Sequence, residues 1–301
     1  MAQTNSYNQL GQHKDLSNIV TLLAPQDTPF QSVIGKTRVS NTLFNWVEEA
    51  LNAADANNAQ IEGGKPAVAT GQDVKERSNY TQIFSRLVSV TGTSEYVDQA
   101  GSLEKLADQV SKRTREVKRD MEKTFLSSQA GAAGTSTTAR KTAGFAAQVD
   151  ASHVIDKAGA AVTEDDVLEA LVRIYEAGGT PDTIMCHPRV RVALTKAITD
   201  NSGRISDRGL QKKIVQSIQT YMSDVGDVAI FNNVHAAYDS GATTGDIYIF
   251  DSSMWDVAFL RPFRVEDLAK DGDATNRLVL AEAGLKNRNF FSSAIIKNVL
   301  V

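Results

Sequence analysis

The chain has 301 residues, of which 42% are hydrophobic, and its 32 basic and 36 acidic residues give a net charge of -4. That length and hydrophobic content suffice for one large domain or a few small ones and exclude a wholly disordered chain. The slight acidity excludes a whole-chain electrostatic surface for phosphates, so any nucleic-acid contact has to be local.

Few residues have the chemistry of a cofactor or metal site. The single cysteine, Cys186, excludes an intrachain disulfide and a cysteine-based zinc cluster, and four scattered histidines argue against a His-rich metal site. The polar residues 1–15 lack the apolar core of a signal peptide, and there is no run of about 18 apolar residues. We therefore predict no cofactor, no metal, no membrane span, and a cytosolic redox environment.

Residues 1–36 predict an N-terminal arm. One short apolar segment, residues 16–24, is followed by Pro25 and Pro29, which prevent a long helix. An arm of this kind has to find a partner surface elsewhere.

Residues 37–98 predict an extended β-hairpin loop. Strand-forming residues gather over 37–49 and again over 79–90, whereas residues 50–78 have little apolar content and a Gly-Gly-Lys-Pro turn. A connection that long is unusual inside a compact domain, so we expect it to project from the body. Trp46 on the first strand is either a core residue or an interface anchor, and the sequence leaves both open.

Residues 99–162 are dominated by a predicted amphipathic helix over about 102–129. Its apolar residues recur at intervals of three and four or their sums and form one narrow stripe on a helical surface. The stripe consists of Leu103, Leu106, Val110, Val117, Met121 and Phe125. At ~1.5 Å per residue the helix would be roughly 40 Å long, which suggests a rod lying across a sheet. After it, the Ser-, Gly-, Ala- and Thr-rich residues 127–144 predict a flexible surface segment.

Residues 163–275 predict an α/β domain, and residues 276–301 predict C-terminal strands that return to the body. A capping box of Thr163 and Asp166 begins a helix over 163–179, and Pro188 suits the first turn of another. Strands are expected at 183–186, 214–222 (which also fits a helix), 227–232, 246–251, 254–260, 277–283 and 290–301. The irregular order of helices and strands argues for an α+β fold and against a doubly wound sheet.

The motifs that resemble catalytic or ligand sites fail on their surroundings. Gly35-Lys36-Thr37 resembles the end of a phosphate-binding loop, but the pattern needs a glycine where Phe30 stands. Cys186 and His187 are adjacent at a strand end and point to opposite faces, so a buried structural cysteine is the preferred interpretation. We predict that the protein is not an enzyme, with a cytosolic hydrolase using Cys186 as the alternative from another class.

Three stretches of the sequence, taken with the order of the predicted elements, resemble a known family. They are residues 81–93 leading into 116–122, residues 184–188 with Leu194 and 201–204, and residues 279–287. Together with the arm, the projecting loop and the long helix, they resemble the major capsid proteins of tailed bacteriophages, which have the Hong Kong 97-type fold. In that resemblance the long helix is the spine of a peripheral domain, and the α/β region is the axial domain.

The resemblance implies a structural protein that self-assembles, as pentamers and hexamers, into an icosahedral head. That head would enclose double-stranded DNA without sequence-specific binding. The implied partners are a scaffolding protein, a portal and a decoration protein, and the implied location is the virion after synthesis in the host bacterial cytoplasm. An encapsulin-like bacterial nanocompartment shell of the same fold is the nearest alternative. Because the arm follows directly from Met1, we expect a separate scaffolding protein or a sequence recorded after processing.

The candidate contacts between subunits lie in the loop and on the long helix. They are Trp46, Lys65, Arg113, Arg115, Lys118 and Arg119. The basic residues of the helix are expected to pair with charges on neighbouring subunits. Lys65 and Lys75 lie in the loop, but no matching acid and asparagine can be assigned, so no cross-link between subunits is predicted.

Overall fold

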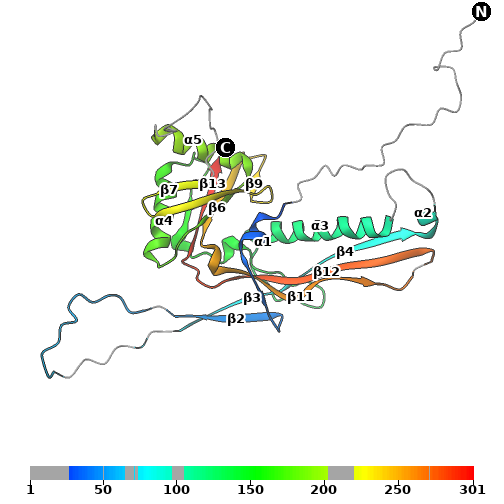
Figure 1. Ribbon diagram of the computed structural model, residues 1–301, viewed down its shortest axis with the longest axis horizontal. Coiled ribbons are helices and arrows are strands. Elements are labelled where there is room, and N and C mark those ends of the chain that lie inside the picture. The colour runs from blue at the N-terminus through cyan, green and yellow to red at the C-terminus, as the bar shows by residue number, and fades with distance from the viewer. Residues whose placement is uncertain are drawn as a thin grey trace, which may run out of the picture.

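The computed structural model describes residues 27–49, 51–64, 71, 74–96, 105–202, 220–270 and 272–301. The molecule has an elongated half and a compact half, and a two-stranded ribbon projects from the place where they meet (Figure 1). Helices and strands are mixed without a regular βαβ alternation, so the predicted α+β class is confirmed.

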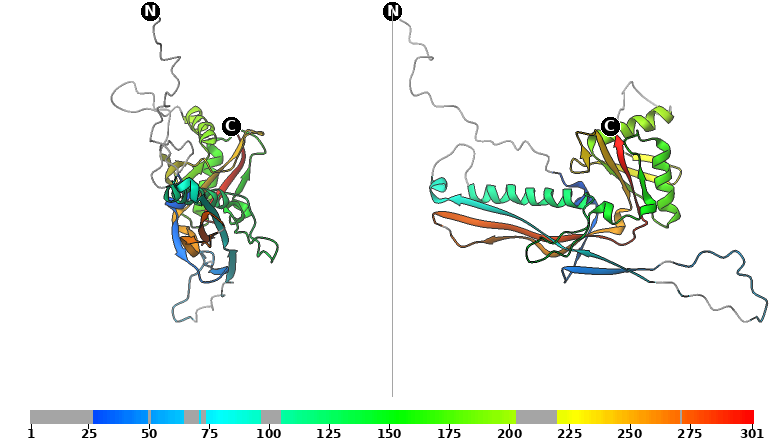
Figure 2. Two further views of the ribbon diagram at one scale, coloured as in Figure 1. Left: turned by 90° about the vertical axis from the view of Figure 1, so that its right-hand side faces the viewer. Right: turned by 180° about the vertical axis from the view of Figure 1, so that it is seen from behind.

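The elongated half is a four-stranded sheet covered by one long helix. The sheet has the order β1 (Gly35–Arg38), β11 (Trp255–Asp267), β12 (Ala274–Asn287) and β4 (Gln82–Thr91), with only the β1–β11 pair parallel. The helix α3 (Lys105–Phe125) lies along β4 and β12 (Figure 2). Two short helices adjoin it, α1 (Pro29–Val33) and α2 (Gly92–Tyr96).

The apolar stripe of α3 faces the sheet, as the spacing predicts. Val117, Met121 and Phe125 are fully buried and belong to one core cluster with Phe84 and Val88 of β4. The predicted end at residue 129 is wrong, because the helix stops at Phe125. The Tyr248 hydroxyl donates to the Leu126 carbonyl at 2.7 Å, so a side chain from the compact half pairs a carbonyl just beyond the helix end. The expected start, residues 102–104, lies outside the described residues.

The segment 127–144 lies mostly at the surface, as predicted, but it has regular backbone pairing and its last residues are buried. Ala132 and Lys141 exchange two backbone hydrogen bonds, and Thr142 and Ala143 are buried. The small side chains allow close approach of the backbone at its end, since a Cβ on Gly144 would lie 2.2 Å from the Ser127 carbonyl oxygen.

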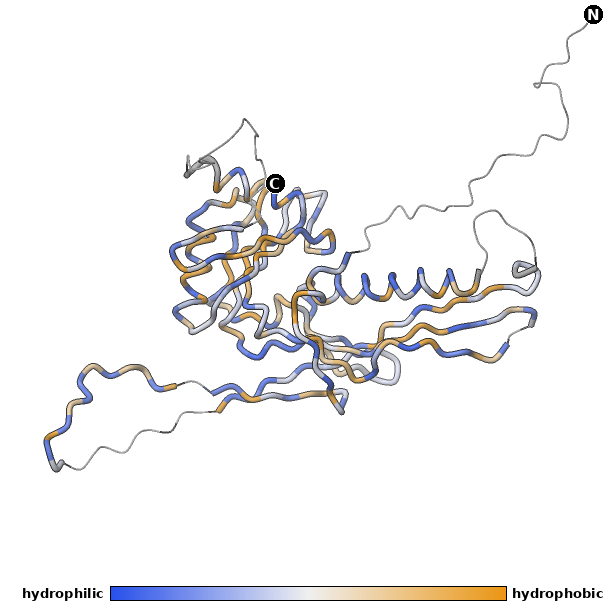
Figure 3. Tube along the Cα trace, in the orientation of Figure 1, coloured by the Kyte–Doolittle hydropathy of each residue, from blue (hydrophilic) through white to orange (hydrophobic). Residues whose placement is uncertain are grey.

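The compact half is a seven-stranded sheet with helices packed on it. The order is β5 (Val154–Asp156), β13 (Ser293–Leu300), β10 (Thr244–Phe250), β6 (Thr183–Cys186), β8 (Gly226–Asn232) and β7 (Thr220–Ser223), with β9 (Tyr238–Asp239) also beside β10. The helices are α4 (Glu164–Glu176) and α5 (Pro188–Ser202), and short 3-10 helices span Phe145–Ala147, Ala151–His153 and Ser252–Met254. Figure 3 shows hydrophobic residues concentrated on the central strands of this half.

The predicted capping box of α4 is confirmed. The Asp166 amide donates to the Thr163 hydroxyl, and the Thr163 amide donates to the Asp166 carboxylate at 2.8 Å. Of the expected element at 214–222, only residues 220–222 are described, and they belong to β7.

The extended hairpin predicted over 37–98 is divided between two sheets. The ribbon consists only of β2 (Leu43–Glu48) and β3 (Lys75–Tyr80), whereas β1 and β4 belong to the elongated half. The expected strand at 79–90 therefore changes sheets at Thr81. Period-2 patterning is the same in both sheets, so it gives no sign of this change.

Candidate functional site

The ribbon has a small core of its own at its base. Phe44 and Trp46 stack with ring centroids 5.8 Å apart, and Phe290 lies 6.4 Å from Trp46. Both β2 rings are buried and form a cluster with Ala258 of β11. The structure therefore places the candidate Trp46 in this intramolecular core.

Beyond the ribbon, the first part of the loop, residues 49–64, has exposed apolar side chains and charges of one sign. Leu51 is 95% exposed and Ile61 is 85% exposed. Residues 49–64 contain the acids Glu49, Asp55 and Glu62 and no basic residue. Apolar side chains left in water on a projecting loop indicate a surface that another molecule covers. Lys65, a candidate contact in the same loop, lies outside the described residues.

The sheet face turned away from α3 has an exposed apolar strip. Phe84 and Val88 point toward α3, so the alternate residues Ile83 and Leu87 point to the opposite face. Ile83 is 50% exposed and Leu87 is 56% exposed. Leu278 of β12 pairs directly with Leu87 and extends the strip. We call Ile83, Leu87 and Leu278 the outer strip.

The four candidate basic residues of the long helix all lie within two turns of α3. Arg113 forms an ion pair with Glu116 at 2.6 Å, and that hydrogen bond raises the pKa of the Arg113 guanidinium. The Lys118 ammonium lies 5.8 Å from the Phe263 ring centroid. Arg115 and Arg119 are spaced by four, as are Arg119 and Lys123, so these three share one helical face, which we call the basic stripe.

A shallow groove lies between β4 and α3, and its lining includes Lys123 of the basic stripe and Ile83 of the outer strip. It encloses about 400 Å³ and is lined by Gln82, Ile83, Phe84, Ser85 and Arg86 of β4 and by Asp120, Lys123 and Thr124 of α3. Arg86 donates to Asp120 at 2.6 Å across it.

A buried carboxylate that the sequence analysis missed connects the arm to both halves. Glu122 of α3 accepts hydrogen bonds from the Phe30 amide at 2.7 Å, from the amide and side chain of Gln31, and from the Asn233 side chain at 2.7 Å. Burial raises the pKa of Glu122, while these hydrogen bonds act in the opposite direction. In the sequence, the sign that this carboxylate is buried is its position beside Met121 of the apolar stripe.

We expect Glu122 to make the free energy of unfolding depend on pH. The folded pKa lies above the ordinary value of 4.5, so the stabilising contribution is complete below that value and is lost as the pH rises through the raised pKa. Urea titrations from about pH 4 to about pH 7 would show the unmodified chain losing stability relative to Glu122→Gln. Parallel curves for the two proteins would contradict this assignment.

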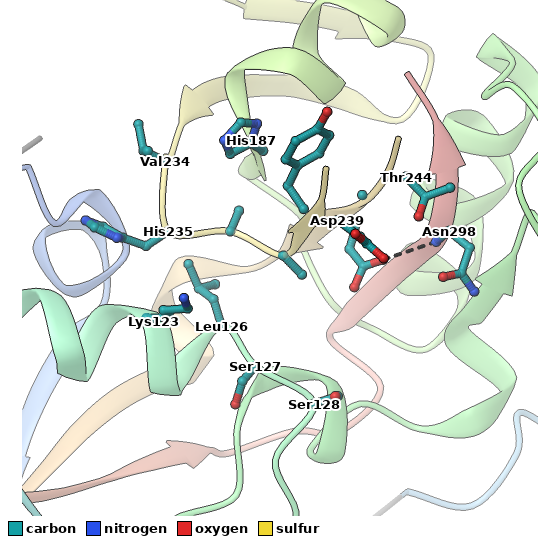
Figure 4. Close-up of a pocket in the computed structure, with 15 residues that line it drawn as sticks. Lys123, Leu126, Ser127, Ser128, His187, Val234, His235, Asp239, Thr244 and Asn298 are labelled. Atoms are coloured by element: carbon teal, nitrogen blue, oxygen red, sulfur yellow. Dashed lines mark hydrogen bonds between the residues drawn. The ribbon is translucent and has the colours of Figure 1, made fainter. Parts of the chain in front are cut away.

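The larger hollow lies between the end of α3 and the compact half (Figure 4). It encloses about 470 Å³, and its lining includes Lys123, His187, Asp239 and Asp246. The His187 ring stacks on Tyr238 at 4.5 Å. Among the residues that the structure describes, no three His, Cys, Asp or Glu side chains are placed to hold a metal ion.

Cys186 lies in the core of the compact half, whereas His187 lines the hollow. Burial raises the pKa of the Cys186 thiol to about 12, so at neutral pH it is not the thiolate that nucleophilic catalysis needs. Within the described chain, no helix has the length and apolar character needed to cross a membrane.

Comparison with known proteins gives a consistent result. The chain matches the family model of the SU10 major capsid protein over residues 2–300. It is 28% identical to the major capsid protein of Escherichia phage Phieco32, with 97% of this chain and 95% of that protein covered.

Solved structures show the same fold at low identity. The capsid of a native GTA particle is 13% identical with a TM-score of 0.67, covering 98% of this chain and 96% of that one. A Gordonia phage Cozz structure is 14% identical with a TM-score of 0.65, covering 95% and 91%. The holo-SrpI encapsulin complex from Synechococcus elongatus PCC 7942 is 14% identical with a TM-score of 0.64, covering 99% and 96%. The predicted Hong Kong 97-type fold is confirmed.

Proposed function

The chain belongs to the SU10 major capsid protein family, and we propose that its pentamers and hexamers form an icosahedral head enclosing double-stranded DNA. It is the major capsid protein of a tailed phage, and as such it forms the virion shell by association with its own copies. The members of this family are structural proteins, which agrees with the prediction that the protein is not an enzyme. The SrpI encapsulin has the same fold, but the family match and the curated relative favour the phage capsid.

The observation that carries the proposal is the ribbon and its loop, whose apolar side chains lie in water. A two-stranded ribbon is at best marginally stable alone, and Leu51 and Ile61 are almost fully exposed. Covering a Leu or Ile side chain contributes about 1.5–3 kcal/mol. Association with further copies would therefore bury apolar side chains that stay exposed when the single chain folds.

The neighbouring subunit offers a surface that matches the loop in chemistry. Its outer strip would receive the apolar side chains, and its basic stripe, of which Lys123 lines the groove, would receive Glu49, Asp55 and Glu62. In this arrangement the loop of one subunit lies along the β4 edge of the next. Lys118 and Arg113 lie on the same helix and remain candidate contacts, as does Lys65 in the loop.

Reversing two charges of the basic stripe tests this arrangement. Arg115→Glu with Arg119→Glu is expected to prevent shell formation while the subunit stays folded. Arg115 is exposed and contributes little to folding, whereas Arg119 is half-buried, so we expect a modest fall in the melting temperature. Sedimentation velocity and electron microscopy would measure assembly. Asp55→Arg with Glu62→Arg in the same chain should restore shells if the loop is the partner. Normal shells from the doubly reversed arginines alone would overturn the arrangement.

The remaining partners follow from the same function. A scaffolding protein and a portal would guide assembly in the bacterial cytoplasm, and a decoration protein would bind the finished shell. The net charge of -4 suits a container that holds DNA without gripping it. Shells formed with portal and packaging proteins should protect DNA from nuclease without sequence preference, and shells that copurify with a cargo enzyme would favour the nanocompartment instead.

A further inference from the structure

The place where the ribbon joins the elongated sheet is a single residue, Thr81, between β3 and β4. The Thr81 amide donates to the Thr42 carbonyl at 2.8 Å, which connects the two strands of the ribbon at its base. The Thr81 hydroxyl donates to the Glu282 carboxylate at 2.9 Å, and the Arg140 guanidinium donates to the Thr81 carbonyl at 2.6 Å. Every polar group of this residue is therefore paired.

Glu282 connects Thr81 to three other parts of the chain. It lies on β12, is almost completely buried, and binds Arg140 from the segment 127–144. Its other oxygen binds Arg261 of β11 at 2.7 Å. Arg261 is flanked on both sides by register shifts between β11 and β12, which bring its side chain to this point. One carboxylate thus joins two arginines and the ribbon base.

The Asn79 side chain makes a second set of contacts one residue before the ribbon ends. Its amide nitrogen lies within hydrogen-bonding distance of the Leu285 carbonyl at 2.6 Å, the Ala143 carbonyl and the Thr142 hydroxyl. Its oxygen accepts from the Ala143 amide at 2.8 Å. These bonds hold the same end of β3 to β12 and to residues 142–143.

Hydrogen bonds of this kind fix the direction in which the ribbon leaves the sheet, whereas apolar contacts do not. The apolar core under the ribbon is small: Phe44 and Trp46 lie with Ala258, and Val39 and Phe290 pack against them. Apolar burial is non-directional, whereas hydrogen bonds to a carboxylate depend steeply on angle, and bonds to charged groups are the stronger ones. The angle between ribbon and sheet therefore depends on Glu282 more than on the aromatic rings.

We propose that Glu282 is a positioning residue for assembly, which fixes the direction of the ribbon and thereby the place where the loop meets the next subunit. Only the part of this inference that concerns assembly rests on the proposed function. The effect on the ribbon itself is a property of the single subunit.

Hydrogen exchange of the unassembled subunit tests the first part. Glu282→Gln keeps the shape of the side chain but removes its charge and replaces one acceptor oxygen with an NH2 donor that faces two arginines. Exchange of the ribbon amides in β2 and β3 should rise at least about tenfold, the equivalent of one lost charge-assisted hydrogen bond. The amides of β10 and β13 in the compact half should be unchanged. Equal acceleration in both halves, or none in the ribbon, would overturn the assignment.

The control is another buried carboxylate in the same sheet. Asp256 of β11 is buried, and its carboxylate binds Arg288, which is not a residue of the ribbon, at 2.6 Å. Asp256→Asn should lower stability without singling out the ribbon. If Asp256→Asn accelerates ribbon exchange as much as Glu282→Gln does, the ribbon responds to general loss of stability and the proposal fails.

Electron microscopy of shells tests the second part. Provided that the unmodified protein forms shells, which tests the proposed function separately, Glu282→Gln should give open sheets or particles of mixed diameter. Asp256→Asn should give the unmodified diameter. Uniform shells from Glu282→Gln, with the ribbon exchanging fast, would show that its direction does not govern assembly and would overturn this part.

Discussion

Replacing Ile83 and Leu87 with aspartate is expected to abolish shell assembly while the subunit stays folded. Both side chains are about half exposed in the single chain, so folding loses little apolar burial when they become polar. Ile83 lies directly opposite Glu282, so a melting curve has to show that the new carboxylate leaves the subunit folded. In the shell they would be covered, and burying an unpaired carboxylate costs far more than the contact it replaces. The effect recurs at every subunit contact of the same kind, which makes the expected outcome close to all or none.

The measurement is sedimentation velocity with a melting curve of the same sample. Ile83→Val with Leu87→Val is the matched control, since it keeps the outer strip apolar and should still assemble. If the aspartate variant forms normal shells at an unchanged melting temperature, the outer strip is not a contact surface.

Replacing Phe30 with alanine is expected to cause the largest loss of subunit stability. The ring is fully buried and meets Phe250 at 5.5 Å, Phe145 at 6.1 Å and Trp255 at 6.2 Å, all edge to face. Truncating a buried phenylalanine costs about 3–5 kcal/mol through lost burial and the cavity left behind. Phe30 also positions the amide that donates to Glu122, so the arm would lose its attachment to α3.

Urea unfolding of the unassembled subunit measures this cost. Phe231→Ala serves as the control, because that ring is 37% exposed and lies on β8 outside the buried core clusters. Its truncation should cost about 1 kcal/mol or less, in line with its smaller burial. Equal losses from the two variants would show that α1 is not held by the core.

Local patterns in the sequence predicted the elements whose causes are local. The stripe of α3, the capping box at Thr163 and the helix beginning at Pro188 each depend on residues a few positions apart. Their boundaries were less secure, since the end of α3 coincides with a contact to Tyr248, 122 residues away.

Features that depend on distant residues could not be predicted in the same way. The strand expected over 79–90 gives no local sign that it changes sheets at Thr81, because its partner there, Glu282, is 201 residues away. The sequence places Glu122 beside the apolar stripe of α3, but it does not show its partners Phe30 and Asn233, which are 92 and 111 residues away. The helix candidates Arg113 to Arg119 do share one element, but Trp46 belongs to the core of the ribbon.

The central claim is that the exposed loop and outer strip exist to be covered by further copies of this chain. Electron microscopy of the purified protein, alone and with its scaffolding protein, tests it most directly. We expect closed shells of uniform diameter in which residues 50–78 resist a protease that cuts them in the free subunit. Discrete monomers under all conditions, with residues 50–78 already protease-resistant, would contradict the account.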